Sequence, residues 1–171
     1  MEKLLKSPVL RLLLAGGLLV FALSWIFSLP MNARYADLVT ERAYLDDPYG
    51  REDIRSIQTR DFVPFTGPLF HGNDARPLWL RLTLAPSANP DWVVMFQPNF
   101  THAIEVWLPQ SDGGWRRAVI GSRFAFSQRE IDTLAPAVAV TASAHHAITV
   151  YARVPTPTTP IYARVLTRAD N

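Results

Sequence analysis

Leucine occupies every second position of the stretch Leu78-Trp79-Leu80-Arg81-Leu82-Thr83-Leu84. Successive side chains of a β-strand point to opposite faces, so this alternation predicts a strand at 78–84 with its leucines in a core. The intervening residues, Trp79, Arg81 and Thr83, would then lie on the other face. A single strand is not stable by itself, and the rest of the chain must supply its partners.

Short apolar runs with turn signals between them follow along most of the chain. They predict strands at 92–96, 104–108, 115–120, 138–140, 148–154 and 161–165. Seven to nine short strands without alternating helices predict an all-β fold, an antiparallel jelly-roll-like β-sandwich. Residues 30–50 are expected to be extended or irregular, and 51–58 to form a helix of about two turns. The predicted core comprises Leu80, Leu82, Ile104, Val106, Leu108, Ile148, Val150 and Val165.

The N-terminus has the character of a membrane-targeting segment. Residues 12–29 are uncharged and long enough as a helix to cross a bilayer, and Lys3, Lys6 and Arg11 precede them. A retained signal anchor and a cleaved signal peptide both fit, and the length of the apolar run favours the anchor. We therefore expect residues 1–30 to form one hydrophobic signal or anchor helix. Residues 34–171 would form a periplasmic domain, either anchored in the inner membrane or secreted to the periplasm.

Composition and motifs exclude several classes of function. The chain has no cysteine, and its 17 Lys and Arg against 15 Asp and Glu leave the predicted domain neutral once the N-terminal segment is set aside. No basic stripe predicts nucleic-acid binding. No catalytic motif is present, the adjacent His145 and His146 would point to opposite faces of a strand, and Asp46 and Asp47 lie in a turn. We expect no enzyme activity, no cofactor and no metal site.

One predicted face carries aromatic and charged residues together. In three strands the aliphatic side chains take one face, and the opposite face carries Trp107, Arg81 and Tyr151, with Glu105 and Arg153 nearby. If the three strands are neighbours, these residues could form a stacking platform with hydrogen-bonding groups for a small ligand such as a sugar. The alternative is that residues 30–72, with their phenylalanines, cover the same face.

A set of short segments resembles a known family in its order along the chain, from about residue 40 to 168. The family is the type 2 extracellular domain of seven-transmembrane receptors with diverse intracellular signalling modules. The segments are Tyr44-Leu45-Asp46-Asp47-Pro48, Phe62-Val63-Pro64, Trp79-Leu80-Arg81-Leu82, Ile104-Glu105-Val106-Trp107-Leu108-Pro109, Gly113-Gly114-Trp115-Arg116, Phe126-Ser127-Gln128-Arg129 and Tyr151-Ala152-Arg153-Val154.

The resemblance implies a jelly-roll sensor domain outside the inner membrane, similar to carbohydrate-binding modules. It implies an extracytoplasmic ligand-binding function, with a carbohydrate or another small molecule as ligand and a membrane signalling partner. The family continues into a seven-helix bundle and an output module, whereas this sequence stops at Asn171, as expected of a truncated relative, a stand-alone sensor or a fragment. The alternative function is an envelope structural or protein-interaction domain that docks on a membrane partner.

Overall fold

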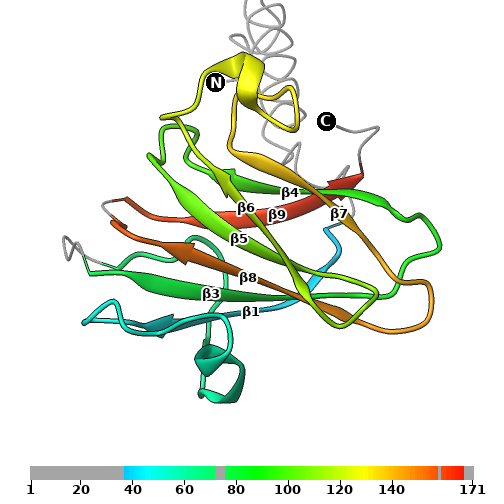
Figure 1. Ribbon diagram of the computed structural model, residues 1–171, viewed down its shortest axis with the longest axis horizontal. Helices are drawn as coiled ribbons and strands as arrows, with labels where there is room; N and C mark the ends of the chain where they lie inside the picture. The colour runs from blue at the N-terminus through cyan, green and yellow to red at the C-terminus, as the bar shows by residue number, and fades with distance from the viewer. Residues whose placement is uncertain (1–36, 72–75, 158, 168–171) are drawn as a thin grey trace, which may run out of the picture. The chain divides into compact units, whose positions relative to one another are not determined.

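The computed structural model describes residues 37–71, 76–157 and 159–167 (Figure 1). The predicted N-terminal helix lies outside the described residues. Within them the chain forms nine strands and two short 3-10 turns, and no α-helix. The elements are β1 (Val39–Asp46), η2 (Ser56–Thr59), β2 (Val63–Pro64), β3 (Leu78–Leu84), β4 (Asp91–Gln97), β5 (Ile104–Pro109), β6 (Trp115–Ile120), η3 (Phe126–Gln128), β7 (Ala137–Thr141), β8 (Ile148–Val154) and β9 (Tyr162–Thr167).

The strands form two antiparallel sheets. The larger has the order β2-β1-β3-β8-β5-β6, and the smaller has the order β7-β4-β9. Every ladder between neighbouring strands is antiparallel. This confirms the predicted all-β, two-sheet architecture, while the jelly-roll connectivity stays a prediction.

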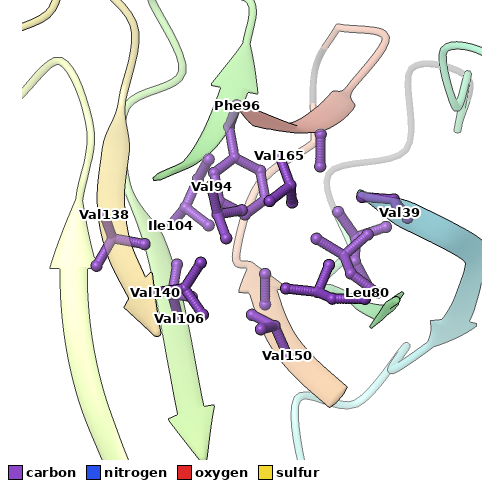
Figure 2. Close-up of a cluster of buried hydrophobic side chains, with 14 of the residues drawn as sticks. Val39, Leu80, Val94, Phe96, Ile104, Val106, Val138, Val140, Val150 and Val165 are labelled. Carbon is purple, nitrogen blue, oxygen red and sulfur yellow. The ribbon is translucent and has the colours of Figure 1, made fainter. Parts of the chain in front are cut away.

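The main core lies between the two sheets. The leucines of β3 meet aliphatic residues of β5 and β8 from their own sheet and of β4, β7 and β9 from the other. In Figure 2, Val94, Phe96 and Val165 of the small sheet approach Leu80 and Val150 of the large one. Of the predicted core residues, seven are buried, and Ile148, opposite Leu84 at the end of the β3–β8 ladder, is half-buried.

Two elements differ from the sequence-based expectations. Residues 39–46, expected to be extended or irregular, form the regular strand β1, which pairs with β3 over most of its length. The helix expected at 51–58 is reduced to the single 3-10 turn η2. Polar side chains explain the second difference, since Asp53 accepts hydrogen bonds from the backbone amides of Arg55 and Ser56 and so favours a tight turn.

Candidate functional site

The five residues predicted to form a ligand face lie on neighbouring strands. The sheet order places β8 between β3 and β5 (Figure 1). Register pairs Arg81 with Tyr151, Tyr151 with Trp107, and Arg153 with Glu105. The structure therefore brings all five together on the outer face of the large sheet, opposite the main core. Their part in binding a ligand stays a prediction.

The floor of this outer face is a cluster of aromatic rings. The rings of Trp79 and Trp107 lie 4.7 Å apart between centroids at an interplanar angle of 36°. The Tyr151 ring contacts Trp115 at 5.4 Å and Phe62 at 5.9 Å. Aromatic contacts of this kind add to the energy of burial, so the floor is a second, smaller core.

The segment between β1 and β2 covers these rings. Ile57 of η2 and Phe62 pack in the same buried cluster as Trp107 and Tyr151, which are 9% and 7% exposed. Ile54, which is partly buried, also packs against the cluster. The sequence left two alternatives for this face, an open stacking platform or a surface covered by residues 30–72. The packing of Trp107 and Tyr151 corresponds to the covered surface. The flat surface of these rings is not open to solvent.

Charged side chains surround the covered rings. Glu105 lies between two arginines, 2.5 Å from Arg117 and 3.6 Å from Arg153. Arg81 pairs with Glu41 at 2.9 Å, and its guanidinium lies over the Phe62 ring at 4.9 Å. These side chains remain accessible, with Arg117 54% and Arg81 28% exposed. We call Arg81, Arg117, Arg153, Glu41 and Glu105 the charged rim.

Asp47 is a residue of the site that the sequence analysis did not single out as structural. It is 2% exposed and accepts hydrogen bonds from the backbone amides of Arg51 and Glu52 and from the Trp79 indole. Its carboxylate also lies 4.0 Å from the Arg153 guanidinium. The signal was the Asp-Pro-Tyr-Gly turn itself, because an Asp before a turn often binds the amides that follow it. Asp47 anchors the covering segment to the outer face.

Two polar groups of the site, the Tyr151 phenol and the Arg153 guanidinium, are affected by burial. Burial raises the pKa of the Tyr151 phenol above its ordinary value, and the charge of Arg81 opposes this to a smaller extent. The Nε atom of Arg153 is buried and has no hydrogen-bond partner among the described residues. An N–H donor left without a partner in such a position is uncommon and invites a water molecule or a ligand.

The remaining candidates for chemistry lie apart from one another. His146 contacts the hydroxyl of Ser143 in the β7–β8 loop, and His71 lies 3.2 Å from Asp46. Within the described residues, no three His, Asp or Glu side chains are grouped closely enough to hold a metal ion. That part of the chain also has no helix long and apolar enough to cross a membrane.

The fold and the outer face together define a two-sheet β domain with a covered aromatic floor and a charged rim. The model of the 7TMR-DISM extracellular 2 family, the resemblance expected from the sequence, matches residues 40–166. The chain belongs to this family of extracellular receptor domains, which assigns it to the extracytoplasmic side of the membrane and to signal sensing. No curated protein matches the chain.

Proposed function

We propose that this domain recognises a small molecule, with carbohydrates as the first class to test, outside the cytoplasm. Binding of the ligand would be passed on to a signalling partner in the inner membrane. Residues 1–30 would anchor the domain in that membrane. The observation that supports the proposal is the family match over residues 40–166, which spans the strands of both sheets apart from Val39 and Thr167 at the two ends. We also propose that the strands are connected as in a jelly roll, as the family resemblance implies.

The charged rim is where we place polar recognition. A guanidinium has five N–H donors in a fixed fork, and the carboxylates of Glu41 and Glu105 use only some of those on the three rim arginines. The remaining N–H groups of these guanidiniums that face solvent suit hydroxyl or carboxylate oxygens of a ligand. In this proposal the covered aromatic rings do not contact the ligand. They hold the rim arginines in position.

The geometry supports these separate roles for the arginines and the rings. Arg117 lies over the Trp107 ring at 5.8 Å, and Arg81 lies over Phe62 at 4.9 Å. A cation over an aromatic ring is attracted to it, so each ring fixes the position of one rim arginine. Trp107 and Phe62 would therefore position the rim arginines, and Tyr151 would support Phe62 through the contact between their rings. Arg81, Glu105 and Arg153 would touch the ligand directly.

Thermal-shift titration of the full-length chain in detergent tests the proposal. The probes are glucose, galactose and N-acetylglucosamine, with glucuronate as an acidic sugar. A ligand at about 100 times its dissociation constant stabilises a domain by about 2.7 kcal/mol, which gives a clear rise in Tm. For glucuronate, the probe with a carboxylate for the rim arginines, Arg81→Ala should abolish the rise. Arg123→Ala, which changes an exposed arginine beside Phe124, should leave it unchanged.

The alternative function predicts a different result. If the domain docks on another envelope protein, none of the sugars will shift Tm, and the chain will crosslink in intact cells to a membrane protein through its surface. An alkaline phosphatase fused after Asn171 must be active for either function, because both require an extracytoplasmic domain.

A further inference from the structure

A cavity of about 620 Å³ lies at one end of the sandwich, away from the outer face. Its walls come from segments that are distant in sequence: the end of β4 and the β4–β5 loop, the loop before β7, the residues just before β9, the start of β9, and Pro68. The side chains that matter to its chemistry are those of Gln97, Asn99, Phe100, Leu134 and Tyr162. Its volume is in the range of about 300–1,000 Å³ typical of small-molecule sites.

The walls of this cavity present large apolar side chains to solvent. Phe100 is 62% exposed and Leu134 is 76% exposed. Burial in the core does not explain either residue, because both side chains stand outside the three buried clusters. Exposed apolar side chains that line a concavity are typical of a surface that binds something.

Hydrogen bonds hold the backbone behind these side chains. The Phe100 carbonyl accepts a bond from the Ser122 hydroxyl at 3.0 Å, and Thr101 donates to the Pro98 carbonyl through its hydroxyl at 2.9 Å. On the other wall, Arg129 donates to the carbonyls of Thr133 and Leu134 at 2.7 and 3.3 Å. A wall that is already ordered loses less entropy when a ligand binds, so the cavity is prepared for an occupant.

The polar groups of the cavity are neutral. No residue among those that line it in the described part of the chain is charged. The side-chain amides of Gln97 and Asn99 line the cavity, and each offers N–H donors and a carbonyl acceptor. The Tyr162 ring is held at the wall by the guanidiniums of Arg42 and Arg164, at 5.0 and 5.3 Å.

We propose that this cavity binds a neutral, ring-shaped small molecule, with its apolar face on Phe100 and Leu134 and its polar edge on Gln97 and Asn99. A charged ligand would find no counter-charge among the lining residues, because Arg42 and Arg164 lie on the Tyr162 ring behind the wall and Arg42 is paired with Asp37. This inference rests on the proposed function, because it takes the domain to be a sensor of small molecules. It assigns recognition to a site different from the charged rim, with a different ligand chemistry.

Calorimetric titration of the full-length chain in detergent tests the inference with two neutral arms. One arm uses glucose and N-acetylglucosamine, and the other uses the aromatic alcohol indole-3-ethanol, so that a sugar ring and an aromatic ring are told apart. Glucuronate and glucosamine serve as charged counterparts. We expect a neutral probe to bind and the charged counterparts to bind at least about tenfold more weakly.

Variants then locate the binding. Phe100→Ala should weaken the neutral probe by about tenfold or more and leave Tm within 2–3 °C of the parent, since the side chain is 62% exposed. Tyr49→Ala is the matched control, because Tyr49 is an exposed aromatic residue (79%) that lies away from the cavity. Asn99→Ala tests the polar edge separately and should also weaken the probe.

The contrary outcomes are distinct. If Arg81→Ala abolishes binding and Phe100→Ala does not, the ligand occupies the charged rim, which overturns this inference and supports the proposed function. Tighter binding of a charged counterpart also overturns it if Phe100→Ala weakens that binding, whereas tighter binding that Arg81→Ala abolishes belongs to the charged rim. If no probe binds and Phe100→Ala instead abolishes dimerisation in sedimentation experiments, the cavity is a contact between copies, and both the inference and the small-molecule function fail.

Discussion

Arg116 in β6 donates a hydrogen bond of 2.9 Å from Nη2 to the carbonyl oxygen of Ala139 in β7, so a side chain of the large sheet bonds the edge strand of the small sheet. Glu130 completes the contact, since it pairs with Arg116 and accepts a bond from the Ala139 amide. The exposed edge of a sheet has unpaired amides and carbonyls that promote aggregation. This pair satisfies both groups of one edge residue.

The same device occurs at the opposite edge of the small sheet. Arg42 donates through Nε to the Ala163 carbonyl of β9 at 3.1 Å, and Asp37, which pairs with Arg42, accepts a bond from the Val165 amide. Arg42 extends from β1 of the large sheet. Each edge of the small sheet is therefore bonded by an arginine of the large sheet and the carboxylate that pairs with it.

The first prediction compares the two arginines. Arg42→Gln should lower the free energy of unfolding by about 2–3 kcal/mol, and Arg116→Gln by about 1 kcal/mol. The difference arises because the Arg42 side chain is 14% exposed and that of Arg116 is 41% exposed, so solvent can replace the lost bonds more readily at Arg116. Urea unfolding measures both variants. Equal losses, or a larger loss for Arg116→Gln, would contradict the argument from burial.

The second prediction concerns the covered floor. Trp107→Ala should lower the free energy of unfolding by about 3–5 kcal/mol, the usual cost of removing a buried tryptophan. Tyr49→Ala should change it by less than about 0.5 kcal/mol, because Tyr49 is 79% exposed. Chemical denaturation followed by tryptophan fluorescence measures both. A loss below about 1 kcal/mol for Trp107→Ala would mean that its ring is free to stack on a ligand.

The third prediction uses two adjacent aspartates as a matched pair. Asp47→Asn should cost about 2–4 kcal/mol, because a buried carboxylate that binds two amides, an indole and a nearby arginine loses its charge and one acceptor oxygen. Asp46→Asn should cost less than about 1 kcal/mol, since the Asp46 side chain is 51% exposed. Thermal unfolding of the two variants side by side is the measurement. Similar values would show that Asp47 does not anchor the covering segment.

The fourth prediction concerns alkaline pH. Burial raises the pKa of Tyr151 in the folded state above its unfolded value near 10, so the folded state keeps this proton more strongly. The resulting stabilisation is complete below the unfolded pKa and is lost as pH rises through the folded pKa. The free energy of unfolding should therefore fall above pH 10, and Tyr151→Phe should show a smaller fall. Urea titrations between pH 8 and 11.5 test this, and identical slopes for the two proteins would contradict it.

The sequence by itself determined most of the strands, though not β1, and which of their side chains point inward. The alternation of leucine in β3, and of aliphatic residues in β5 and β8, is a local property of the chain, because successive side chains of a strand always take opposite faces. The shared face of Trp107, Arg81 and Tyr151 followed from the same rule. The 3-10 turn at 56–59 escaped prediction, since the Asp53 carboxylate outweighs the helical spacing of Ile54 and Ile57.

Only the tertiary structure decided what lies on that face and where a cavity opens. Phe62 reaches Tyr151 from a segment 89 residues earlier in the chain, and no local pattern encodes such a contact. The burial of Asp47, the edge bonds of Arg42 and Arg116, and the walls built around Phe100 and Leu134 likewise depend on how distant segments pack. Side-chain direction is a matter of backbone geometry between neighbours, whereas exposure is set by whichever part of the chain arrives from elsewhere to exclude water.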